Sequence, residues 1–81
     1  MSSQVSLENP IRRRRLELGL SQVDLAMACG VSELTVRRWE TWQPRGPRDF
    51  RRIAAALEMA PAELARQYRA WHSEIASRRP R

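Results

Sequence analysis

The sequence has little that could staple or anchor a fold. Its one cysteine, Cys29, cannot form an internal disulfide, and no Cys/His cluster has metal-ligand spacing. No apolar run approaches the roughly 18 residues of a membrane span, and the N-terminus lacks the basic and apolar regions of a signal peptide. We therefore expect one small cytoplasmic domain with no metal, other cofactor or membrane contact, which gains stability from dimerisation.

Residue groups needed for enzyme chemistry are also missing. No nucleophile stands with a base, no carboxylates pair at a plausible site, and no glycine-rich phosphate loop occurs. A chain of 81 residues also has no room for a separate ligand-sensing domain, so no small-molecule ligand is expected. An enzyme is therefore not the predicted function.

What the sequence has in excess is positive charge. Fifteen arginines, with no lysine, stand against nine acidic residues and give a formal net charge of +6. Arginine suits forked contacts to phosphate and guanine, although an all-arginine usage equally fits a GC-rich genome. The charge favours a polyanionic partner over a merely solvated basic surface.

The pattern of caps and breakers predicts an all-α fold. Asn9 and Ser32 are suitable N-caps, Ser21 with Asp24 resembles a capping box, and Gly30 can end a helix. The predicted helices cover about residues 10–18, 22–28 and 33–41, a loop follows, and two further helices open at Pro47 and Pro61. No strand-like alternation and no internal repeat is present.

Residues 15–64 resemble the Cro/C1 (lambda-repressor-like, XRE) helix-turn-helix family. The marks that carry this resemblance are Leu18 to Gln22, Leu25-Ala26, Gly30-Val31-Ser32, Val36, Trp39-Glu40, a proline before the fourth helix, and Ala54 with Leu57. The resemblance implies a five-helix lambda-repressor-like domain that binds double-stranded DNA, most simply a bacterial, plasmid or phage repressor. It also implies a salt bridge between Arg15 and Glu40, the alternative being two independent exposed charges.

In this family the third helix lies in the major groove. If Val36 and Trp39 face inward, the outward arc carries the candidate base readers, which are Glu33, Leu34, Arg37 and Arg38. An arginine can fork onto guanine, a glutamate can accept from cytosine, and a leucine can pack on a thymine methyl. Which arginine reads a base and which neutralises phosphate is open.

A second set of residues is predicted to contact phosphate. By resemblance, the start of the second helix and the loop after the third follow the DNA backbone; the candidates are Ser21, Gln22, Thr35, Gln43, Arg45 and Arg48. The Arg12 to Arg15 run is left open between phosphate contact and solvation. The sequence departs from the family at Thr41-Trp42, where an Asn-Gly pair is common, so the end of the third helix is expected to differ. Trp42 is interpreted as packing on the domain in preference to touching DNA.

A heptad-like stripe, Leu64, Tyr68, Trp71 and Ile75, runs past the usual end of this family's domain. Left in water, the last three would form a large apolar patch, so we predict that Tyr68, Trp71 and Ile75 form a homodimer interface. The alternative is that this helix folds back over its own domain. His72, beside the stripe, is predicted to be a surface residue.

These predictions divide the chain into a flexible arm (1–8), a DNA-binding domain (9–65), a dimerisation extension (66–78) and a basic tail (79–81). The predicted function is a homodimeric repressor that occludes promoters by binding a palindromic operator, with recognition helices about 34 Å apart. The alternative is an antitoxin-type autoregulator whose last helix binds a partner protein. Nonspecific DNA or RNA binding would leave the acidic Glu33 unexplained.

Overall fold

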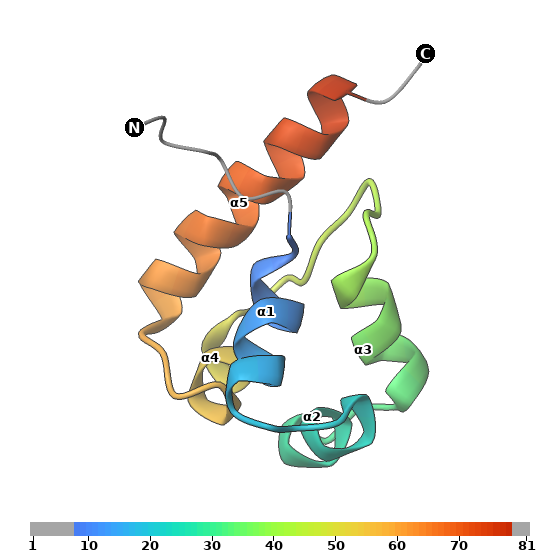
Figure 1. Ribbon diagram of the computed structural model, residues 1–81, viewed down its shortest axis with the longest axis vertical. Helices are drawn as coiled ribbons and strands as arrows, with labels where there is room; N and C mark the ends of the chain where they lie inside the picture. Colours follow the sequence, from blue (N-terminus) through green and yellow to red (C-terminus); the bar gives the residue numbers. More distant parts are fainter. Residues whose placement is uncertain (1–7, 79–81) are drawn as a thin grey trace.

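The computed structural model describes residues 8–78, which form five helices and no strand (Figure 1). The helices are α1 (Pro10–Glu17), α2 (Gln22–Cys29), α3 (Glu33–Glu40), α4 (Arg51–Ala56) and α5 (Pro61–Arg78). The all-α, five-helix prediction is confirmed over this range. None of these helices is both long enough and apolar enough to cross a membrane. Residues 1–7 of the predicted arm and the predicted tail 79–81 lie outside the described residues.

The predicted caps begin the first three helices. The Asn9 side chain accepts from the backbone N–H groups of Ile11 and Arg12 at 2.9 and 3.0 Å. Ser21 and Asp24 form a reciprocal capping box, and Ser32 accepts from the Thr35 N–H at 3.1 Å. Each cap satisfies backbone N–H donors that the first helical turn leaves unpaired. Because these contacts are local, the starts of the three helices could be predicted from the sequence.

The predicted start of the fourth helix at Pro47 is wrong. Pro47 lies in the loop, and α4 begins at Arg51. The Asp49 carboxylate accepts from the Arg51 N–H at 2.9 Å, which satisfies a backbone donor at the start of α4. Asp49, and not Pro47, therefore marks the beginning of this helix. The loop between α3 and α4 is longer as a result and runs along the domain (Figure 1).

The long helix α5 completes the core of its own domain. It packs against α1 and α4, and its Leu64, Tyr68 and Trp71 side chains join the same buried cluster as Ile11 and Leu25. Tyr68 is 3 % exposed and Trp71 is 6 % exposed. The hydrophobic core therefore continues across the predicted domain boundary between residues 65 and 66.

This burial also corrects the predicted dimer interface. Tyr68 and Trp71 are covered within the chain, and Ile75 is half-buried against the same core, so no large aromatic patch is left for a second copy. The alternative, in which the helix folds back over its own domain, describes the structure. The reason is long-range packing on α1 and α4, which a heptad-like spacing does not report.

Trp42 and His72 lie together between the α3–α4 loop and α5. The Trp42 indole N–H donates to the His72 carbonyl at 3.0 Å, and the two rings stack with centroids 4.8 Å apart. The packing interpretation of Trp42 thus agrees with the structure. The prediction that His72 is a surface residue is wrong, because its ring is half-buried by these contacts.

Candidate nucleic-acid interface

The turn between α2 and α3 sets the direction of α3. Gly30 adopts the left-handed conformation, with φ of 70°, which a residue with a Cβ atom adopts at a cost. The Val31 N–H donates to the Ala26 carbonyl at 3.0 Å, and Ser32 then caps α3. With Leu25, Ala26 and Val36 buried beneath the turn, the two helices form one rigid corner.

One buried ion pair ties α3 to α1. The Arg15 guanidinium donates to both carboxylate oxygens of Glu40, at 2.6 and 2.9 Å, and to the Leu20 carbonyl at 2.8 Å. Both side chains are almost completely buried. Hydrogen bonding to the Glu40 carboxylate raises the pKa of Arg15 above its ordinary value. The structure contains the salt bridge predicted from the family resemblance, and this salt bridge holds the end of α3 against the core.

The outward side of α3 carries the four predicted base readers. Leu34 is 54 % exposed, and Arg37 and Arg38 are exposed as well. Glu33 is half-buried at the start of the helix. The inward Val36 is fully buried. The helical period therefore separates a packing side from a side that is free to meet a partner, and the reading roles themselves stay predictions.

The two arginines of this face differ in their surroundings. Arg37 pairs with Glu33 at 3.2 Å and donates to the Gln22 side chain at 3.4 Å. This ion pair is exposed and contributes about 0–1 kcal/mol at most, so a base or phosphate can replace it readily. Within residues 8–78, the Arg38 guanidinium has no ion-pair partner. Of the two arginines predicted to read bases, Arg38 therefore has fewer contacts within the chain to exchange for a contact with DNA.

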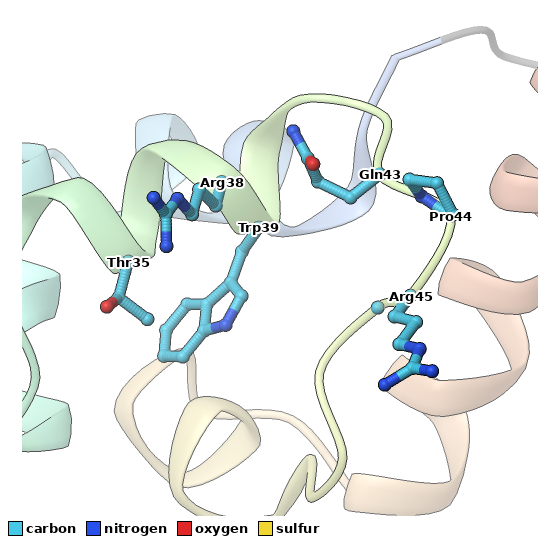
Figure 2. A pocket seen from close by; sticks show the side chains of 7 residues that line it. Thr35, Arg38, Trp39, Gln43, Pro44 and Arg45 are labelled. Carbon is cyan, nitrogen blue, oxygen red and sulfur yellow. The ribbon is translucent and has the colours of Figure 1, made fainter.

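Part of the predicted phosphate-contacting set lies beside these readers. A groove of about 440 Å³ separates α3 from the loop that follows it, and its lining includes Thr35, Gln43 and Arg45 together with Arg38, one of the predicted readers. Figure 2 shows the Trp39 indole projecting into the space between them. Trp39 and Pro44 were not predicted to line a site; the half-exposure of Trp39 gave no signal in the sequence, because its spacing marked it only as a packing residue.

Other members of that set lie elsewhere. Arg48 is exposed but does not line the groove. Gln22 at the start of α2 is engaged, donating to the Glu40 carboxylate at 3.1 Å and accepting from Arg37. The Ser21 hydroxyl is likewise engaged, accepting from the Asp24 N–H at 2.9 Å. Their contacts to phosphate remain predictions.

The Arg12 to Arg15 run is mostly structural. Arg13 donates to Gln67 at 3.2 Å, Arg14 donates to the Leu57 carbonyl at 2.9 Å, and Arg15 is buried against Glu40. Arg12 is the one exposed member of the run. The run therefore ties α1 to α4 and α5 more than it extends the basic surface.

A comparison with protein families identifies the domain. A family model described as helix-turn-helix matches residues 11–64, which is more than half of the chain. No curated protein and no solved structure matches the chain significantly. The matched range contains the turn at Gly30, the buried pair of Arg15 with Glu40 and the exposed side of α3. The chain belongs to the Cro/C1-type helix-turn-helix family, whose members bind DNA and regulate transcription.

Proposed function

We propose that this protein is a sequence-specific repressor of transcription that acts in the cytoplasm. The observation that carries the proposal is the outward side of α3, where Glu33, Leu34, Arg37 and Arg38 stand on a helix fixed by a buried core and a buried ion pair. Fixed side chains that donate, accept and offer apolar contact are what direct readout of base edges requires. An acidic group among them favours sequence-specific over indiscriminate binding.

The backbone contacts are proposed around this helix. Thr35, Gln43 and Arg45 flank the groove beside α3, and Ser21 and Gln22 lie at the N-terminus of α2, whose partial positive charge suits a phosphate. Arg48 is proposed to reach the backbone farther along the loop. A net charge of +6 supports the general attraction.

We propose further that two copies bind one palindromic operator. Four reading side chains on one helix cover few base pairs, and each discriminates by about 1–3 kcal/mol, which is little against the competing sites of a genome. Two copies on an inverted repeat would double that discrimination. Their interface cannot be the aromatic face of α5, since Tyr68 and Trp71 are buried in each chain.

We propose repression by occlusion of a promoter, because this action requires only that the domain bind its operator. The alternative, an antitoxin-type regulator, was based on an α5 stripe left free to cover another polypeptide. The structure removes this argument for a partner protein, because the stripe packs into its own domain. Copurification of a stoichiometric second chain from the native operon would reinstate the alternative.

The test is selection of bound sites from a random duplex pool, followed by titration of the winner and of a scrambled duplex at two salt concentrations. We expect enrichment of an inverted repeat and a large preference for the winner at both concentrations. Equal affinity for all duplexes, governed by salt alone, would contradict the proposal. An Arg66→Ala variant, which removes one exposed positive charge from α5, is the control for charge alone.

A further inference from the structure

The loop after α3 is held by α5, far away in the sequence. Thr41 leaves α3 in an extended conformation, with φ of −112° and ψ of 153°, where a left-handed turn is common in this family. The next two residues meet α5: Trp42 donates to the His72 carbonyl at 3.0 Å, and His72 Nε2 lies 2.6 Å from the Gln43 carbonyl. We call these paired contacts of Trp42, Gln43 and His72 the loop clamp.

The chemistry of the loop clamp fixes the direction of both hydrogen bonds. A carbonyl oxygen only accepts, so His72 Nε2 must carry a proton and donate to Gln43. The indole N–H of Trp42 donates in the opposite sense, from the loop to α5. The imidazole also stacks on Tyr68, whose ring is buried in the core. His72 is therefore held on both sides, between a loop residue and a core residue.

The loop makes a second contact with α5 at Gly46, three residues after Gln43. A Cβ atom at Gly46 would lie 2.5 Å from the Tyr68 ring, so the Gly46 backbone passes directly over that ring. The loop is thus in contact with α5 at Gln43 and again at Gly46. Pro44 and Arg45 lie between these two points and line the groove beside α3 (Figure 2).

We propose that His72 and Trp42 are positioning residues for DNA binding: by clamping the loop to α5, they hold Gln43 and Arg45 at the DNA backbone beside the reading helix. This role rests on the proposed function. A loop ordered before binding does not lose conformational entropy when it meets phosphate, so the clamp raises affinity without touching DNA. Its effect falls on backbone contacts, and base preference stays with α3.

The test compares full-length variants on the duplex that the wild type selects and on a scrambled duplex. His72→Phe keeps an aromatic ring and removes the donor, His72→Gln keeps an N–H donor, Trp42→Phe removes the indole donor, and Ser73→Ala changes an exposed neighbour on α5. For each variant we would measure the dissociation constant against salt concentration, the melting temperature, and hydrogen exchange at the Arg45 and Gly46 amides.

We expect His72→Phe and Trp42→Phe to weaken binding to both duplexes by about 3- to 10-fold and to lower the salt slope by about one. Their loop amides should exchange faster, His72→Gln should recover most of the affinity, and Ser73→Ala should match the wild type. A role in stability alone would lower the melting temperature and leave the salt slope of the folded protein unchanged.

Two failures are distinguishable. If the wild type selects a site and the folded His72→Phe and Trp42→Phe variants bind it with unchanged affinity and salt slope, the positioning role is overturned and the proposed function stands. If the wild type selects no site, the proposed function fails and the positioning role fails with it.

Discussion

At the scale of single residues, Glu40 links α3 to α1 through its ion pair with Arg15. Its carboxylate accepts two hydrogen bonds from the buried Arg15, and Gln22 donates a third. Replacing it with Gln leaves a buried guanidinium without a counter-charge, which typically costs about 3 kcal/mol. We expect Glu40→Gln to lower the free energy of unfolding by this order, measured by urea denaturation.

The matched control is Glu17→Gln, which breaks the exposed pair of Glu17 with Arg14. An exposed pair contributes about 0–1 kcal/mol, so its loss should be small. A Glu40→Gln variant no less stable than Glu17→Gln would show that the buried pair does not hold α1 to α3.

Arg38 carries the sharpest prediction about reading. Its guanidinium is exposed, lacks an ion-pair partner among the described residues and sits where α3 meets the groove. If it forks onto a guanine, Arg38→Ala should cost about 1–3 kcal/mol of binding free energy on the selected duplex and relax the preference at one base position. Titration against a set of single-base variants of that duplex measures both quantities. An equal loss on every duplex would make Arg38 a phosphate contact.

At the scale of elements, the capping box of α2 makes a prediction about pH. Hydrogen bonds from the Ser21 backbone N–H and hydroxyl lower the pKa of Asp24 below its ordinary value of 3.8. A pKa that is lower in the folded chain means that the carboxylate stabilises the fold above about pH 3.8. That contribution is lost as the pH falls through the folded-state value. Asp24→Asn should therefore destabilise the protein at pH 7, and the difference from the wild type should shrink as the pH falls below 3.8.

Thermal unfolding of both proteins across this pH range tests the prediction. Glu58→Gln is the control, because this exposed side chain follows the end of α4 and caps no helix start. A difference between wild type and Asp24→Asn that is the same at pH 7 and pH 2 would mean that the charge of Asp24 does not support the cap.

The packing of α5 indicates that the folded domain extends beyond residue 65, where the family pattern ends. A chain truncated after Ala65 loses the buried Tyr68 and Trp71, and each such side chain contributes roughly 1.5–3 kcal/mol or more on burial. That loss is a large part of the 5–15 kcal/mol typical of a folded domain. We expect the truncated chain to lose cooperative unfolding by circular dichroism, whereas a chain ending at Arg78 keeps it. A cooperative transition in the shorter chain would restore the boundary at 65.

The helix ends show which features of the fold can be predicted from the sequence. Asn9, Ser21, Ser32 and Gly30 act on backbone groups a few residues away, so local spacing was enough to predict them. The start of α4 was wrongly predicted at Pro47, because a proline is compatible with a helix start but forms no hydrogen bond of the kind that Asp49 makes with the Arg51 N–H.

At the scale of the whole molecule, the wrong predictions about α5 and His72 share one cause. The covering of Tyr68 and Trp71, and the contact between Gln43 and His72, join segments that are not neighbours along the chain. Spacing within one helix shows that a stripe is apolar but not which surface it meets. The outward side of α3 was predictable because one buried position, Val36, fixes the rotation of that helix.

Assembly on DNA is the last property argued at this scale. If two copies read an inverted repeat, a duplex with both half-sites one turn apart should bind two chains more tightly than a duplex with one half-site. Inserting about half a turn, ~5 bp, should abolish the gain, because the second half-site then lies on the opposite face of the duplex. Light scattering of each complex gives the number of chains bound, and titration gives the affinities. One chain per duplex, with equal affinity for the single and the repeated half-site, would mean that one reading helix supplies all of the specificity.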